Sequence, residues 1–154
     1  MSVMNGFYRV METLKDELQA DPNCNTITFG DISEVDLSKQ TIFPLSHIIL
    51  NGATSGENVM TFNVSILSMD IVDISKDEVT DIFVGNDNEQ DVLNTQLSVL
   101  NKVIQKLRIG SLYAEKYQVV GDVGLEPFRD RFENQIAGWT ATFDVMIAND
   151  VNVC

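Results

Sequence analysis

The stretch from residue 86 to residue 110 constrains the fold most, because it has the pattern of one long amphipathic helix. Its apolar residues recur at spacings of three and four, the period of a helix with one buried face. They are Val92, Leu93, Leu97, Val99, Leu100, Val103, Ile104 and Leu107. Asn86 and Glu89 predict a capping box at its start, and Gly110 predicts a left-handed residue at its end. Burying one such side chain contributes roughly 1.5–3 kcal/mol, so we expect the rest of the chain to supply an apolar surface.

The remaining elements are a first helix and several strands. Apolar residues at helical spacing predict a helix over residues 3–20, which the sequence Asp21-Pro22-Asn23 ends. Patterns typical of strands occupy residues 26–30, 45–50, 60–66, 117–120 and 139–147. Turn residues predict loops over 51–58, where two strands would form a hairpin, and over 121–132. Residues 31–40 and 70–83 carry no clear pattern.

Two of these strands indicate how the sheet is built. Residues 60–66 and 139–147 alternate between apolar and polar side chains, as in an antiparallel sheet that has one buried face. The order helix, strands, long helix, strands then predicts an α+β fold, in which the N-terminal helix and the long helix pack on one face of an antiparallel sheet. With 154 residues, the chain has the size of a single domain, spanning residues 1–154.

The charge is strongly acidic, with 10 Lys and Arg against 23 Asp and Glu and a net charge of −13. This balance argues against a protein that grips nucleic acid, because phosphate binding needs a basic face. The N-terminus lacks the pattern of a secretory signal, and no apolar run approaches the ~20 residues that cross a bilayer. Cys24 and Cys154 do not form a disulfide framework. We expect a reducing cytoplasm, or a particle assembled there, and no membrane.

The sequence offers little catalytic chemistry. The only histidine, His47, lies in an apolar strand and is interpreted as structural. No zinc-binding or phosphate-binding motif is present, so we expect no catalytic residue, no cofactor and no metal. The densest carboxylates, in the stretch from Asp70 to Asp81, lack the glycine turn of a calcium loop. We interpret them as a solvated or interfacial acidic face.

The order of elements resembles that of the tail-terminator, or tail-completion, proteins of long-tailed bacteriophages. In that family an N-terminal helix precedes strands, one long helix follows, and a final pair of strands closes an antiparallel sheet. The resemblance covers essentially the whole chain. The matching positions are the helix that ends before Pro22, the Phe43-Pro44-Leu45-Ser46-His47 start of the first long strand, the hairpin through Gly52 and Gly56, the helix from Asn86, and the closing strand led by Gly138-Trp139.

The resemblance implies a non-enzymatic virion protein, assembled in the host cytoplasm. It would form a homo-oligomeric ring, a hexamer, at the head-proximal end of the tail tube, where it would end tube polymerisation and join the tail to the head connector. Its partners would be the tail tube protein and the neck proteins, and DNA would pass through an acidic lumen without specific binding. We hypothesise that the contacts between neighbours, or the lining of the ring, involve Asn51, Gly52, Ser55, Gly56, Glu57, Asp70, Asp73, Asp77, Glu78 and Asp81.

Three alternatives stay open. A head-tail connector or neck adaptor would be a small ring-forming protein at the same junction. An acidic DNA mimic would instead be a monomer or dimer that competes with DNA for a basic enzyme. A small enzyme would need a pocket in which at least one carboxylate of a pair titrates abnormally.

Overall fold

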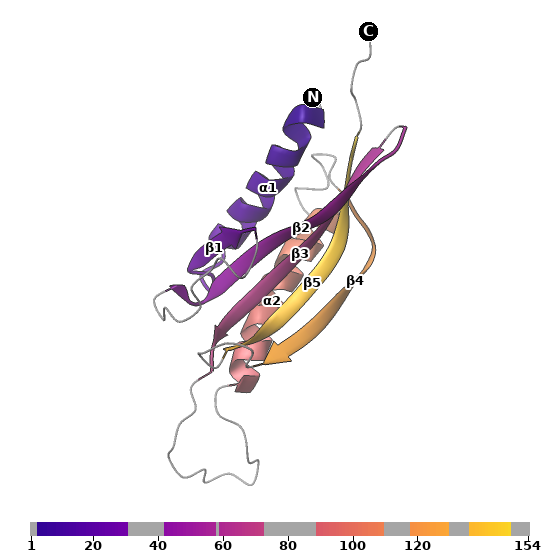
Figure 1. The fold of residues 1–154 in the computed structure, drawn as a ribbon. Coiled ribbons are helices and arrows are strands. Elements are labelled where there is room, and N and C mark those ends of the chain that lie inside the picture. The colour runs from indigo at the N-terminus through magenta and orange to yellow at the C-terminus, as the bar shows by residue number, and fades with distance from the viewer. Residues whose placement is uncertain are drawn as a thin grey trace, which may run out of the picture.

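The protein is an α+β domain with one five-stranded sheet and two helices, as the sequence predicts (Figure 1). The computed structural model describes residues 3–30, 42–57, 59–72, 89–109, 118–129 and 136–148. Its helices are α1 (Val3–Gln19) and α2 (Glu89–Ile109), and its strands are β1 (Thr26–Phe29), β2 (Leu45–Ser55), β3 (Val59–Ile71), β4 (Gln118–Arg129) and β5 (Ile136–Ala148). The strand order across the sheet is β1-β2-β3-β5-β4.

The sheet is antiparallel except at its β1 edge. β2 pairs with β3, β3 with β5, and β5 with β4, all antiparallel. β1 pairs parallel to β2, with Thr26 opposite Leu45 and Phe29 opposite Ile48. Residues 30–44 separate β1 from β2, and a parallel pair needs a connection of about a dozen residues or more. The short first strand therefore joins the sheet by a crossover and not by a hairpin.

Both helices share one core with one face of the sheet. In Figure 1, α2 runs behind β3 and β5, and α1 runs along the side of the sheet where β1 and β2 lie. The buried residues of this core are Val10, Leu14 and Leu18 of α1, Val99, Leu100, Val103, Ile104 and Leu107 of α2, and Ile48, Phe62, Val64, Ile66, Val119, Ala141, Phe143, Val145 and Ile147 of the sheet. The predicted apolar stripes of the long helix and of strands 60–66 and 139–147 are confirmed.

Two ion pairs join the helices outside this core. Lys106 Nζ lies 2.5 Å from a carboxylate oxygen of Glu17, and Lys102 Nζ lies 3.6 Å from Asp21. The Asp21 side chain is only 4% exposed, although Lys102 is 60% exposed. The pairs connect Glu17 of α1, and Asp21 just after it, to the C-terminal part of α2. Each contributes at most about 1 kcal/mol because the lysines are solvated.

The predicted loop over residues 51–58 is wrong for its first half. β2 continues through Ser55, and Gly52 to Ser55 pair with Asn63 to Met60 after a register shift at Asn51. Glycine, asparagine and serine favour turns locally, but the cross-strand hydrogen bonds to β3 outweigh that preference. The result is an exposed extension of the hairpin, which we call the arm and define as residues Asn51–Glu57.

The predicted loop over residues 121–132 is likewise wrong as far as residue 129. β4 runs to Arg129, with a β-bulge between Val120 and Gly124 that includes Gly121 at φ 70°. The bulge accommodates the extra residues without ending the strand. Arg108 donates a hydrogen bond of 2.7 Å to the Gly121 carbonyl. The proposed caps of the long helix at Asn86 and Gly110, and most of the unassigned segments 31–40 and 70–83, lie outside the described residues.

Candidate interaction surfaces

The sheet face opposite α1 and α2, which we call the helix-free face because neither described helix covers it, carries a hydrogen-bonded polar row across three strands. The Asn51 amide donates to Asn63 Oδ1 and to Ser65 Oγ, both at 2.8 Å. The Asn63 amide donates to Asp144 Oδ1 at 2.8 Å, and Ser65 Oγ lies 2.9 Å from Thr142 Oγ1. Because the side chains of this row pair mainly with one another, the row holds β2, β3 and β5 in register and presents a polar surface.

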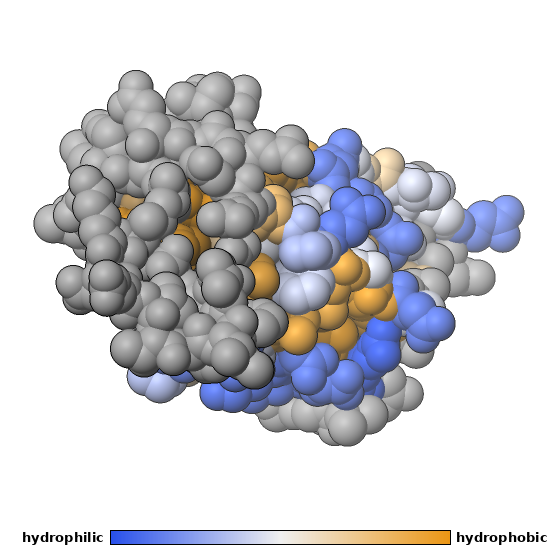
Figure 2. All heavy atoms as spheres, turned by 90° about the horizontal axis from the view of Figure 1, so that it is seen from below, coloured by the Kyte–Doolittle hydropathy of each residue, from blue (hydrophilic) through white to orange (hydrophobic). Residues whose placement is uncertain are grey.

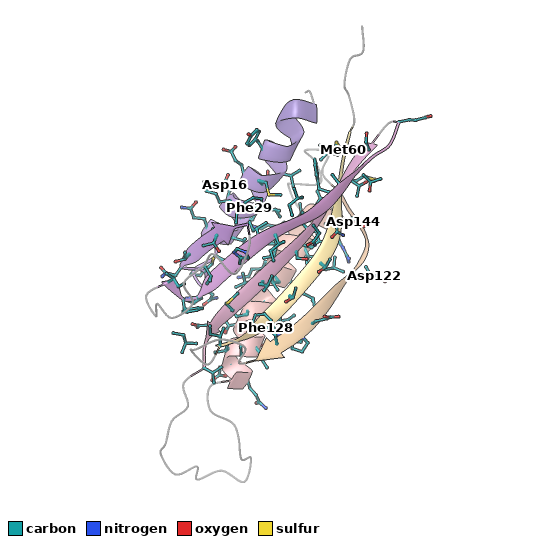
Figure 3. All side chains as sticks on the ribbon, viewed as in Figure 1. Asp16, Phe29, Met60, Asp122, Phe128 and Asp144 are labelled. Atoms are coloured by element: carbon teal, nitrogen blue, oxygen red, sulfur yellow. The ribbon has the colours of Figure 1, made fainter. Side chains whose placement is uncertain are left out.

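Charge is unevenly distributed between the sheet and the helices. Among the described side chains, every cation lies on a helix; these are Lys15, Lys102, Lys106 and Arg108. The described charged side chains of the strands are all carboxylates, namely Asp70, Asp122, Glu126 and Asp144. Figure 3 shows Asp122 and Asp144 on the β4–β5 side of the molecule, away from Asp16 and Phe29. The sheet therefore presents negative charge with no described compensating cation of its own.

The predicted interface residues do not form one surface. Asn51, Gly52, Ser55, Gly56 and Glu57 lie together in the arm and are exposed. Asp70 lies toward the opposite end of β3, about 23 Å from the Gly52 end of the arm and about 33 Å from its Ser55 end at the usual rise of a strand. Asp73, Asp77, Glu78 and Asp81 lie outside the described residues. The hypothesis therefore divides into an arm surface and a separate Asp70 end.

Asp70 is half-buried, whereas the predicted interface residues of the arm are exposed. Its burial raises the pKa of the carboxyl group above the ordinary value of 3.8, and a 2.7 Å hydrogen bond from the Ile71 amide opposes part of that rise. The folded protein thus holds the Asp70 proton more tightly than the unfolded chain does. Asp70 therefore makes its full contribution to the free energy of unfolding below pH 3.8, where its carboxyl group is neutral in both states. This contribution is lost as the pH rises through the raised pKa of the folded protein.

We therefore expect Asp70→Asn to raise the free energy of unfolding at neutral pH. Asparagine keeps the acceptor for the Ile71 amide but carries no charge to desolvate. The gain should shrink toward zero as the pH falls below about 4, where Asp70 itself is neutral in both states. Urea unfolding of both proteins between about pH 3 and pH 7 measures the difference. Asp122→Asn, which removes the same charge from an exposed site, should change stability by less than about 0.5 kcal/mol, and a pH-independent gain in Asp70→Asn would contradict the explanation.

His47 is held on both ring nitrogens and is fully buried. Nε2 lies 2.8 Å from the Gly30 carbonyl oxygen, which can only accept, so Nε2 carries the proton. Nδ1 then accepts from the Thr28 hydroxyl at 2.6 Å. The imidazole of His47 thus links β1 to β2 through hydrogen bonds on both of its nitrogens. This arrangement supports the structural interpretation of His47.

A second buried polar group lies under α2 and was not predicted. Ser68 Oγ donates to Gln96 Oε1 at 2.5 Å and lies 3.4 Å from Ser46 Oγ, which in turn is 3.5 Å from Cys24 Sγ. Burial raises the pKa of the Cys24 thiol, so the thiol and not the thiolate is favoured. Gln96 falls three residues after Leu93 and four before Leu100, and this spacing could have placed it on the buried face.

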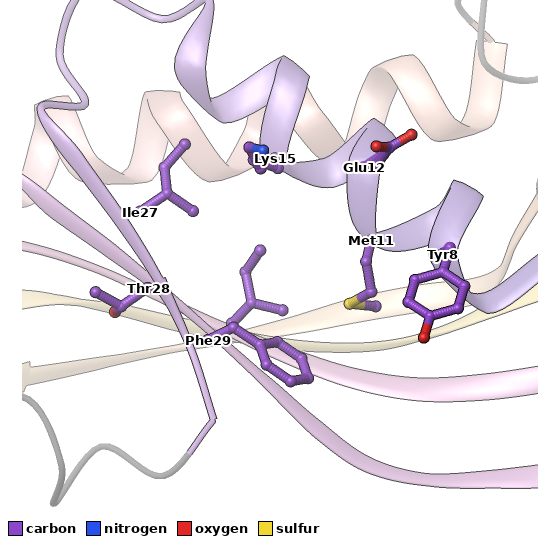
Figure 4. Close-up of a pocket in the computed structure, with 8 residues that line it drawn as sticks. Tyr8, Met11, Glu12, Lys15, Ile27, Thr28 and Phe29 are labelled. Atoms are coloured by element: carbon purple, nitrogen blue, oxygen red, sulfur yellow. The ribbon is translucent and has the colours of Figure 1, made fainter.

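An apolar groove of about 300 Å³ lies between α1 and the edge strand β1. It is lined by Tyr8, Met11, Glu12, Lys15, Ile27, Thr28, Phe29 and Ile48 (Figure 4). Phe29 is 55% exposed and Tyr8 is 68% exposed, and no other large apolar residue among the described residues is as exposed. In Figure 4, Lys15 lies at the Ile27 end of the groove and Tyr8 at the Phe29 end. The sequence did not predict this groove, because its two sides are distant along the chain.

The end of the sheet opposite the arm is apolar. Phe43, Leu45, Met69 and Ile136 form a small buried cluster there, and Phe128 packs against it. Figure 2, which views the molecule from below, shows apolar residues exposed between hydrophilic ones. Along the strands, this buried apolar cluster lies at the end of the sheet where Figure 3 labels Phe128, and the polar row lies toward the arm.

The structure and the comparisons add no catalytic or metal assignment. Among the described residues, no three His, Cys, Asp or Glu side chains are grouped so as to hold a metal ion. Within the same residues, neither helix has the length and apolar character needed to span a membrane. No protein-family model matches the chain, and no curated protein matches it.

Proposed function

We propose that this protein is a non-enzymatic subunit of a ring at the head-proximal end of a bacteriophage tail tube, where it ends tube polymerisation and joins the tail to the head connector. The observation that carries the proposal is the division of charge between the two layers of the domain. A ring around DNA needs a channel wall that does not bind phosphate, and a separate surface by which each copy contacts its neighbour.

The helix-free sheet face has the properties of such a wall. Its described charges are the carboxylates of Asp144 and Glu126, and the donors of the polar row are used by neighbours within the row. A row of this kind offers DNA no cation to bind, and its carboxylates repel the phosphates. In this arrangement the helices, with all the described cations, face away from the channel.

The arm supplies a contact by which one copy reaches the next. Residues Asn51–Glu57 are exposed and extend beyond the part of β2 that pairs with β1. A contact between the arm of one subunit and a different surface of its neighbour is heterologous, and repeated heterologous contacts close into a ring when the rotation fits. The order of elements, which resembles that of tail terminators, agrees with this arrangement.

The test is the mass of the protein in solution, measured by light scattering at several concentrations and accompanied by negative-stain images. We expect closed rings of three or more copies with a central hole, either in solution or on tail tubes. The double variant Thr54→Lys with Ser55→Lys places two charges on opposite faces of the arm and should abolish the rings. The matched control, Asn94→Lys with Gln105→Lys on exposed positions of α2, should leave them intact.

Each of three other outcomes would contradict a different part of the proposal. Rings that survive the arm variant would remove the arm from the interface. A protein that forms no ring on tubes, but displaces DNA from a basic DNA-binding enzyme, would favour the DNA mimic. A head-tail connector would form rings that bind the head side and do not stop tube growth in a polymerisation assay.

A further inference from the structure

The two described edges of the sheet differ in how they are protected from pairing with another chain. β4 contains a β-bulge and Pro127, and it exposes Asp122 and Glu126. These are the usual devices that prevent an edge strand from adding a further strand. β1 has only its shortness as protection, because its four residues, Thr26–Phe29, carry no charge, no proline and no bulge. Next to it lies the apolar groove with the exposed Phe29 side chain.

The hydrogen-bonding groups of β1 that point away from β2 can be assigned from the bonds on its other side. The Thr26 amide donates to the Pro44 carbonyl at 3.2 Å, and the Gly30 amide donates to the Ile48 carbonyl at 3.0 Å. Residues of a strand alternate in direction, so the N–H and C=O groups of Ile27 and Phe29 point away from β2. The same two residues direct their side chains into the groove.

We propose that β1 pairs with β1 of a second copy of this chain, antiparallel and about a two-fold axis at Thr28. This register places Ile27 opposite the partner's Phe29, and each such pair exchanges two N–H···O bonds. Both apolar side chains then lie on the helix face, where they fill the grooves of the two copies. The two sheets become one continuous sheet, and the two α1 helices lie antiparallel on the same side.

Charge along the groove favours a second copy as the occupant. Glu12 and Lys15 are exposed on α1 and line the groove, with Lys15 at the Ile27 end and Tyr8 at the Phe29 end. The two-fold axis that brings Ile27 to the partner's Phe29 therefore brings Lys15 toward the partner's Glu12. The contact is made twice by symmetry, so the rim of the groove is complementary to itself.

This inference does not depend on the ring. A two-fold contact closes at two copies, whereas the ring needs a heterologous contact through the arm. If both contacts exist, the arm variant leaves dimers, and a substitution in β1 halves the mass of the complete assembly. If only one contact exists, only one of the two sets of substitutions changes the mass, so the two proposals fail separately.

Phe29→Lys tests the apolar part of the contact. Lysine at this exposed position puts a charge into the shared edge, and the dimer dissociation constant should rise by about tenfold or more. The mass should fall toward the 17.2 kDa of one chain, which sedimentation velocity over a range of concentrations measures. Gln105→Lys, which adds the same charge on an exposed part of α2, should leave the dimer unchanged. Unaltered circular dichroism and melting temperature show that each variant is folded.

An exchange of charges tests the symmetry. Glu12→Lys and Lys15→Glu should each weaken the homodimer, because each places like charges across the axis. Mixing the two variants should restore dimers that contain one copy of each, because the two positive positions of E12K then face the two negative positions of K15E. Wild-type protein that stays monomeric, a dimer that Phe29→Lys leaves intact, or a mixture that forms no mixed dimers would each overturn the proposal.

Discussion

The Gly138→Ala protein is expected to lose about 2–4 kcal/mol in its free energy of unfolding. Gly138 lies in β5 opposite Met69 of β3, and a Cβ atom added there would overlap the Ser68 carbonyl oxygen and sit 2.9 Å from the Met69 Cα. Both contacts are with backbone atoms in the middle of the sheet, so no side chain can rotate away. Relief requires β3 and β5 to separate, which breaks ladder hydrogen bonds.

The same substitution at Gly52 is the control. A Cβ atom at Gly52 meets nothing within 4 Å, and this residue does not have a positive φ. Gly52→Ala should leave stability unchanged or raise it by up to about 1 kcal/mol, because alanine has less freedom in the unfolded chain. Urea unfolding of both variants gives the comparison. Equal stability of the two would show that β3 and β5 are farther apart at Gly138 than the structure places them.

The second large effect is expected from His47→Leu. Leucine is similar in bulk and apolar, but it leaves the Thr28 hydroxyl and the Gly30 carbonyl without the ring nitrogens that now pair with them. Each polar group left unpaired in a buried setting costs about 1–3 kcal/mol, so we expect a loss of about 2–4 kcal/mol. The loss should be local, because His47 connects β1 to β2, and amide exchange should accelerate in β1 before the rest of the sheet.

Thr28→Val separates the two hydrogen bonds of His47. Valine keeps the shape of threonine and removes only the bond to Nδ1, so the loss should be about 1 kcal/mol. Because β1 forms the proposed dimer contact, His47→Leu should also weaken dimerisation even though His47 does not touch the partner. A His47→Leu protein with unchanged stability and unchanged exchange in β1 would contradict the role assigned to the histidine.

Local sequence pattern determined the elements with strong periodicity. The α2 stripe and the alternation in β3 and β5 each specify which side chains are buried, because a helix repeats every 3.6 residues and a strand every two. From these elements the α+β class follows, since each has one apolar face that must be covered. The interpretation of His47 also followed from its apolar neighbours in β2.

The tertiary structure decided what depends on pairing between distant residues. β2 continues through Gly52 and β4 continues through Gly121, although the sequence predicts loops at both places. Pairing of β2 with β3 and of β4 with β5 outweighs the local preference for turns. The parallel β1 edge, the groove beside it, the buried Gln96 and the half-buried Asp70 arise only when separate elements meet. The arm and the β1 edge, the two surfaces on which both proposals rest, are therefore products of strand pairing that no single stretch of the sequence encodes.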